Sequence, residues 1–135
     1  MASSSTIAEL LDTARASLDR LPPVAAHSAV GRGALLVDTR CAENRSETGV
    51  VPGSVHVPLS VLYWRLDRTS GYDDPRLSDP ERQVILLCQH GYSSSLAAAT
   101  LRQLGFARAT DVIGGFEAWV AAGLPVEPAP GTAPR

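Results

Sequence analysis

Two short, uninterrupted apolar runs constrain the fold of this chain most strongly. Ala34–Val37 lies between a glycine turn and the polar triplet Asp38-Thr39-Arg40, and Val84–Leu87 ends at Cys88. Runs of this length without polar alternation are typical of strands buried on both faces, as in parallel sheets covered by helices. Weaker runs at 54–57 and 110–113, with a short edge strand near Leu21, predict further strands.

Helical patterns alternate with these strands. Thr6 and Glu9 have the spacing of a capping box, and the apolar residues after them recur at helical spacing, so one apolar stripe of this helix should pack on the rest. Further helices are predicted at 24–30, 59–66, 94–104 and 116–122. A left-handed Gly105 is expected after the helix at 94–104, and an exposed loop at 67–82. This order predicts an α/β fold with a mostly parallel sheet and helices on both faces.

Composition limits the function. The 135 residues, 44% hydrophobic, suffice for one domain, and a net charge of -2 without a basic cluster argues against a nucleic-acid partner. All 12 basic residues are Arg, which excludes lysine Schiff bases and phosphate-loop lysines. The chain shows two cysteines, no readable signal peptide and no run suited to a membrane span, so we predict a cytoplasmic protein with reduced thiols.

Three loops follow the predicted strands and lead into helices. They are Asp38-Thr39-Arg40, Cys88–Ser93 and Gly114-Gly115. Because the carboxyl ends of parallel strands share one edge of the sheet, and helix N-termini point toward that edge, we expect all three loops to meet at one ligand site.

The middle loop carries the clearest chemical signal. Cys88 ends a strand and is followed within five residues by a helix start, so successive backbone N–H groups can surround its sulfur and stabilise a thiolate. Gly91 permits the tight curvature, and Ser93–Ser95 add hydroxyl donors and a helix cap. A cysteine at a strand end is more often a small buried hydrophobe, but this loop favours a nucleophile. Cys41, in a polar loop, is incidental or a resolving thiol.

Other kinds of site fit the residues less well. The cysteines and histidines form no pair at metal-ligand spacing, so we predict no metal and no cofactor. The serine-hydrolase pattern Gly-x-Ser-x-Gly fails at Ser95. A cysteine phosphatase needs an arginine at the end of its loop, where this chain has Ser93 and Ser94.

Three stretches together resemble the single-domain rhodanese-like sulfurtransferases. They are residues 36–40, residues 49–54, and residues 85–94 with 114–119 and 123–126. The resemblance implies a five-stranded parallel sheet and a rhodanese-like domain at 21–126, between an N-terminal helical extension at 1–20 and a flexible Pro-rich tail at 127–135. It also implies that Cys88 is the catalytic residue, which carries a sulfane sulfur as a persulfide.

The remaining site residues follow from the same resemblance. The loop residues expected to bind substrate are Gln89, His90, Gly91, Tyr92, Ser93 and Ser94. The residues expected to organise the site are Asp38, Arg40, Gly114 and Gly115. Family members often carry an arginine in the loop, which is absent here, so Arg40, Arg45 or Arg65 would have to reach the mouth to hold a dianion. Arg45 is our candidate for substrate binding.

The expected function is transfer of a sulfane sulfur from thiosulfate or a small persulfide to a thiol or cyanide, with a protein as another acceptor. A preformed thiolate needs no base, so His90 is expected to bind rather than to act as a general base. Tyr92 either selects the acceptor at the rim or packs. The alternative is a module without turnover that relays sulfur, senses persulfide or binds a partner.

Overall fold

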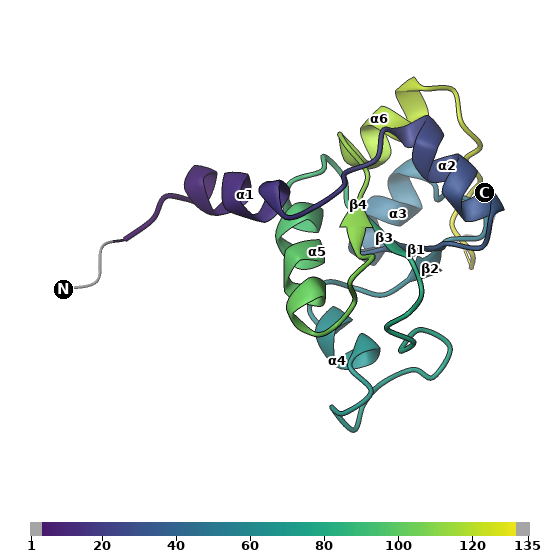
Figure 1. Ribbon diagram of the computed structural model, residues 1–135. Coiled ribbons are helices and arrows are strands. Elements are labelled where there is room, and N and C mark those ends of the chain that lie inside the picture. The colour runs from purple at the N-terminus through teal and green to yellow at the C-terminus, as the bar shows by residue number, and fades with distance from the viewer. Residues whose placement is uncertain (1–3, 132–135) are drawn as a thin grey trace.

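The computed structural model describes residues 4–131 and places a four-stranded, all-parallel sheet at the centre of the chain, in the order β2-β1-β3-β4 (Figure 1). The strands are β1 (Leu35–Asp38), β2 (Val55–His56), β3 (Val84–Leu87) and β4 (Thr110–Asp111). The helices are α1 (Ile7–Ala16), α2 (Pro23–Gly31), α3 (Ala42–Thr48), α4 (Leu62–Leu66), α5 (Ser93–Gln103) and α6 (Gly115–Ala121). The predicted α/β class with helices on both faces of a parallel sheet is confirmed.

The two central strands divide the core into two layers because their side chains alternate between the faces of the sheet. On one face, Leu35 and Leu86 pack with residues of α4 and α5. On the other face, Leu36 and Ile85 pack with Ala26 of α2 and with residues of α6. Figure 1 shows α4 and α5 on one side of the sheet and α2 and α6 on the other. The uninterrupted apolar runs therefore have the cause inferred from the sequence, namely burial on both faces.

The expected fifth strand is reduced to a single bridge. Leu21 pairs in parallel with Val112, through Leu21 N–H to Asp111 O at 3.1 Å and Ile113 N–H to Leu21 O at 2.8 Å. Pro22 and Pro23 follow at once. Because proline has no N–H to donate and Pro23 already begins α2, the ladder ends after one residue. The prediction of five strands was therefore wrong by one.

Several boundaries differ from those predicted. Helix α3 was not predicted, because each of its residues is at least partly exposed and no apolar stripe marks it. Helix α4 begins three residues late, at Leu62, and α5 begins at Ser93. The cap position before α5 therefore falls on Tyr92, and the predicted serine cap was wrong. Gly105, with φ of 101°, has the left-handed conformation expected after this helix.

The two ends of the described chain pack on the domain to different degrees. Thr6 and Glu9 form the predicted capping box of α1. The last turns of α1 pack beside α5, but Ile7 and Leu10 are 68% and 50% exposed, so the predicted apolar stripe contacts the domain only in part (Figure 1). At the other end, Glu127 and Val50 exchange two backbone hydrogen bonds of 2.8 Å.

Residues 132–135 of the predicted tail lie outside the described residues, so its expected flexibility stays a prediction there. Between residues 4 and 131, no helix combines the length and the apolar character that crossing a membrane requires.

Candidate active site

Three strand-to-helix loops meet at the carboxyl edge of the sheet, as the parallel topology requires. In the register of β1 and β3, Asp38 lies beside Leu87, so the loops after these strands begin side by side. The Arg40 guanidinium donates to Gln89 Oε1 at 3.1 Å and joins the first loop to the second. Phe116 N–H donates to Cys88 O at 2.8 Å and joins the third loop to the second. The expectation that the three loops share one edge is confirmed.

The Cys88 thiol lies directly after β3 and is only 5% exposed. Gly91 N–H donates to its Sγ at 3.1 Å, and Ser94 Oγ lies 3.1 Å from the same sulfur. Burial alone would raise the pKa of this thiol. Hydrogen bonds from the Ser94 and Ser93 hydroxyls and from the backbone N–H groups of Ser94 and Gly91 outweigh burial, and the pKa lies below its ordinary value. The site therefore favours a thiolate.

Backbone contacts explain why N–H groups of this loop face the sulfur. The carbonyl oxygens of Cys88 and Gln89 accept from the first N–H groups of α6, at 2.8 and 3.2 Å. The Gly91 carbonyl accepts from the guanidinium groups of Arg15 and Arg20, at 2.8 and 3.1 Å. In a curled loop the carbonyl and N–H groups point to opposite sides. Because these carbonyls are bonded on the outside of the loop, the N–H groups point inward, toward the sulfur.

Gly115 is where α6 and the loop come closest. A Cβ built on this residue would lie 2.5 Å from Cys88 O and 2.7 Å from Gly91 N, and its φ is 64°. We expect Gly115→Ala to lower the free energy of unfolding by about 2–4 kcal/mol in urea titrations, since it adds a backbone clash to left-handed strain. Gly123→Ala is the matched control, because φ is 73° there but no atom lies within 4 Å. Equal losses in the two variants would refute the close contact.

A buried carboxylate lies behind the nucleophile. Asp111, on β4, accepts from the Ser94 hydroxyl at 2.7 Å and from the Ser95 hydroxyl at 2.8 Å. The Arg20 guanidinium pairs with both of its carboxylate oxygens, at 2.8 and 3.2 Å. Arg15 also approaches, donating to Ser95 Oγ at 3.2 Å. A connected polar network thus runs from the Cys88 sulfur to the segment that precedes α2.

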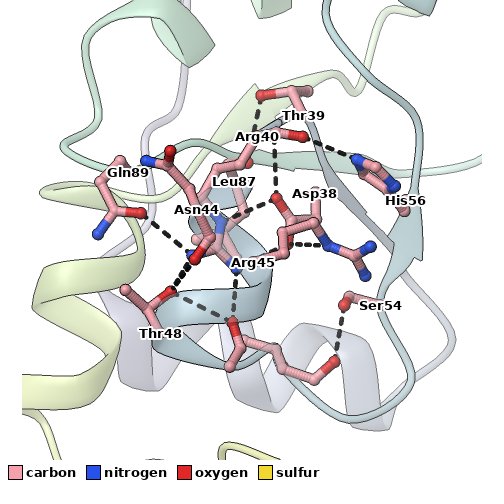
Figure 2. Close-up of polar contacts among 12 residues, drawn as sticks. Asp38, Thr39, Arg40, Asn44, Arg45, Thr48, Ser54, His56, Leu87 and Gln89 are labelled. Carbon is pink, nitrogen blue, oxygen red and sulfur yellow. Dashed lines mark hydrogen bonds and ion pairs between the residues drawn. The ribbon is translucent and has the colours of Figure 1, made fainter. Parts of the chain in front are cut away.

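Asp38, Arg40 and Arg45 form a second charged cluster, shown in Figure 2. The Arg40 guanidinium pairs with both Asp38 carboxylate oxygens, at 3.1 and 2.9 Å, and Arg45 Nε lies 3.1 Å from Asp38 Oδ2. Arg40 also donates to Thr48 Oγ1 and Gly49 O, and its guanidinium lies 3.9 Å from the centre of the Phe116 ring. These contacts tie Arg40 to the framework of the first loop.

Arg45 and Arg65 have hydrogen-bond partners other than the thiol. Arg45 is held against Asp38, in the cluster of Figure 2. Arg65 donates to Tyr72 O at 3.1 Å, in the loop that follows α4. Substrate binding by Arg45 therefore stays a prediction, and it would require its guanidinium to leave or share the Asp38 carboxylate.

The other predicted loop residues have contacts of their own: His90 and Tyr92 are exposed, and Gln89 bonds to Arg40. His90 Nδ1 is 2.8 Å from Glu117 Oε2, and both side chains are largely exposed. Tyr92 is 61% exposed, with the Arg15 guanidinium 5.5 Å from its ring centre. Gln89 bonds to Arg40 beneath the loop. Selection of the acceptor by Tyr92 stays a prediction.

Sequence reasoning missed Arg15, Arg20 and Asp111. The available signal was Asp111 itself, a carboxylate inside a predicted strand of a sheet expected to be covered on both faces, because a buried carboxylate requires a partner. Its partner was not identifiable, since Arg20 lies 91 positions away in the chain.

The lowered pKa of Cys88 predicts a measurable pH dependence. Alkylation by iodoacetamide needs the thiolate, so the rate for Cys88 should reach half its maximum at a lower pH in the folded protein than in the urea-unfolded chain. Alkylated peptides counted by mass spectrometry separate Cys88 from the exposed Cys41. A higher midpoint in the folded protein would mean that burial outweighs the hydrogen bonds.

Comparison with known proteins identifies the family. The family model described as a rhodanese-like domain matches residues 23–122. The chain belongs to the rhodanese-like domain family. Thiosulfate sulfurtransferase GlpE of Pseudomonas syringae pv. syringae (strain B728a) is 38% identical over 100 residues, covering 74% of this chain and 85% of that protein. Adenylyltransferase and sulfurtransferase MOCS3 of Oryza sativa subsp. japonica is 37% identical over 93 residues, which cover 66% of this chain and 21% of that protein.

A solved structure resembles this rhodanese-like protein over nearly the whole chain. It is a protein of unknown function from Rhodopseudomonas palustris CGA009, described as a possible tyrosine phosphatase. The two chains superpose with a TM-score of 0.85 at 28% identity, over 94% of this chain and 98% of the other. The predicted family and fold are confirmed.

Proposed function

We propose that the chain is a rhodanese-type sulfurtransferase that moves a sulfane sulfur from thiosulfate or a small persulfide to a thiol or cyanide through a Cys88 persulfide. The observation that supports it most is the Cys88 thiol, held at the end of β3 by Gly91 N–H and the Ser94 hydroxyl with a lowered pKa. The similarity to proteins named thiosulfate sulfurtransferase supports the same reaction class. A cytoplasmic location would keep this thiol reduced between turnovers.

The reaction needs no group beyond the thiol and the loop. The Cys88 thiolate attacks the outer sulfur of thiosulfate, a new S–S bond forms to the enzyme, and sulfite leaves with the electron pair of the broken S–S bond. The enzyme then carries a persulfide anion, whose charge the loop N–H groups stabilise. Cyanide or a thiolate attacks the terminal sulfur, takes it as thiocyanate or a new persulfide, and restores the Cys88 thiolate.

The same geometry argues against a phosphatase. Phosphate transfer at a cysteine loop needs a bidentate arginine facing the anion. Here Arg15 and Arg20 bind the outward-facing Gly91 carbonyl, and Arg40 is held by Asp38 and its neighbours. We therefore expect thiosulfate, a dianion, to bind weakly.

The alternative is a module without small-molecule turnover that relays sulfur to a protein, senses persulfide or binds a partner. The match to adenylyltransferase and sulfurtransferase MOCS3 covers only 21% of that protein, so a similar domain also occurs as part of a larger sulfurtransferase. The two hypotheses differ in whether the sulfur on Cys88 passes to small acceptors.

Loading and release of sulfur test the proposal. The reduced protein is incubated with thiosulfate or with glutathione persulfide, the mass of the Cys88 peptide is measured, and thiocyanate is followed after cyanide is added. A gain of one sulfur with repeated thiocyanate release is the expected result. Loading without release to small acceptors would favour the relay, and no loading from either donor would overturn the enzyme. No phosphate release from p-nitrophenyl phosphate is expected.

A further inference from the structure

A buried ion pair lies one hydroxyl away from the nucleophile. Asp111 is fully buried and the Arg20 side chain is 15% exposed, with 2.8 Å between Arg20 Nε and Asp111 Oδ1. Ser94 Oγ connects the pair to the thiol, because it lies 2.7 Å from Asp111 Oδ2 and 3.1 Å from Cys88 Sγ. A charge in a buried position acts strongly on its neighbours, since water screens it little. The pair therefore lies where its charges can act on the protonation state of Cys88.

The Ser94 hydroxyl has a single hydrogen for two neighbours that compete for it. When Cys88 is a thiol, its S–H can donate to Ser94 Oγ, and the hydroxyl donates to Asp111. When Cys88 is a thiolate, the sulfur accepts, and the Ser94 hydrogen has to turn from the carboxylate to the sulfur. Asp111 then keeps the Ser95 hydroxyl and the two Arg20 N–H groups. Arg20 thus makes it easier for Asp111 to release the Ser94 hydrogen.

Arg20 belongs to a part of the chain outside the matched family domain, which begins at residue 23. Arg15, on α1, accompanies it, but its contacts are to Gly91 O and Ser95 Oγ rather than to the carboxylate. Asp111 by itself would oppose ionisation of Cys88, both by its negative charge and by its hold on Ser94. The segment before α2 supplies the cation that offsets it.

We propose that Arg20 is a positioning residue for the nucleophile: by neutralising Asp111 it leaves the Ser94 hydroxyl free to turn to Cys88, and so sets how readily the thiol ionises. The inference deepens the proposed function, which assigns Cys88 as the sulfur carrier, but the ionisation itself can be measured without sulfur transfer.

Other charged groups around the loop have different partners. His90 and Glu117 pair with each other on the exposed side, and Arg40, beneath Gln89, pairs with Asp38. These groups, on the loop, α6 and the end of β1, are unchanged in the test below. Arg20→Ala also removes the bond from Arg20 to Gly91 O, which Asp111→Asn leaves in place, so the comparison of the two variants separates the charge from that contact.

The test is the pH dependence of Cys88 alkylation by iodoacetamide, with peptides counted by mass spectrometry. Arg20→Ala should raise the midpoint by about 0.5–1 pH unit, because it leaves the buried Asp111 charge uncompensated. Below the midpoint this corresponds to alkylation that is about 3- to 10-fold slower. Asp111→Asn, which keeps an oxygen acceptor but removes the charge, should lower the midpoint. Arg20→Lys should restore it most of the way toward that of the unmodified protein.

The opposite signs distinguish charge tuning from a merely structural role, which would shift both variants in the same direction. Arg76→Ala is the matched control, since it breaks an exposed Arg–Asp pair in another loop and should leave the midpoint unchanged. If Asp111→Asn does not fold, the double variant Arg20→Ala/Asp111→Asn replaces it, with a midpoint expected below that of Arg20→Ala.

An unchanged midpoint in Arg20→Ala would overturn the inference. So would a midpoint in Asp111→Asn above that of the unmodified protein, or a midpoint in the double variant no lower than that of Arg20→Ala. Failure of sulfur loading with the expected midpoints would instead overturn only the proposed sulfurtransferase reaction, because alkylation reports the thiolate directly.

Discussion

Cys88→Ser is expected to load no sulfur from thiosulfate or glutathione persulfide and to lower thiocyanate formation about 10³-fold or more. A serine hydroxyl stays protonated at neutral pH in a loop that stabilises a thiolate, so the sulfur acceptor of the first step is lost. The variant should fold, since its hydroxyl can occupy the same position between Gly91 N–H and Ser94 Oγ. Mass spectrometry of the loaded peptide and initial rates of thiocyanate formation measure the two effects.

Cys41→Ser is the control for that variant. The Cys41 thiol is exposed at the N-cap position of α3 and donates to Asn44 Oδ1, in the first turn of that helix, at 3.0 Å. Its removal should leave loading of Cys88 and turnover unchanged. Loading of sulfur on Cys41 in the Cys88→Ser protein, or loss of turnover in Cys41→Ser, would assign it the role of a second sulfur carrier.

The sequence indicated the centre of this fold because burial on both faces leaves a clear pattern. Val84–Leu87 is apolar without interruption since each face of β3 meets helices, and the strand was predicted at the observed positions. The loop after it was equally accessible to prediction, because a thiol at a strand end, a glycine and a helix start are adjacent in sequence. Local signals of this kind do not depend on distant partners.

The surroundings of the thiol could not be predicted in the same way. Helix α3 carries no apolar stripe, so its polar surface hid it. The partner of Asp111 is an arginine 91 positions earlier, and among the 12 basic residues nothing local distinguishes Arg20. Because the loop itself has no arginine, the sequence offered Arg40, Arg45 and Arg65 as candidates. It gave no sign that Arg15 and Arg20 of the N-terminal segment bind the loop at the Gly91 carbonyl.

The two charged clusters hold the loop from opposite sides. Asp38 and Arg40 fix Gln89 from the end of β1. Asp111 and Arg20 fix Ser94 and Gly91 from β4 and the N-terminal segment. Buried polar groups that are fully hydrogen-bonded specify one conformation, and every alternative placement of the loop would leave buried charges unpaired. These bonds and ion pairs therefore hold the loop around Cys88 in one conformation.

Arg40→Ala should have the largest effect on stability. The Arg40 side chain is 2% exposed and is the bidentate partner of a fully buried Asp38. Its removal leaves that carboxylate with Arg45 Nε and one backbone N–H, and empties a volume beside the Phe116 ring. Breaking one member of a buried pair costs about 3–5 kcal/mol, a large part of the free energy of unfolding of a small domain.

Urea unfolding followed by tryptophan fluorescence measures the effect of Arg40→Ala, because Trp119 lies in the buried core on the α6 side. The exposed pair of Arg76 and Asp74 offers the control: Arg76→Ala should show no measurable change, since solvent screens that pair. Arg40→Lys should recover little, because one ammonium group cannot reproduce a bidentate contact with Asp38 together with bonds to Gln89 and Gly49 O. Stability close to that of the unmodified protein in Arg40→Ala would show that Arg45 alone neutralises Asp38, and the Asp38–Arg40 pair would then be dispensable to the fold.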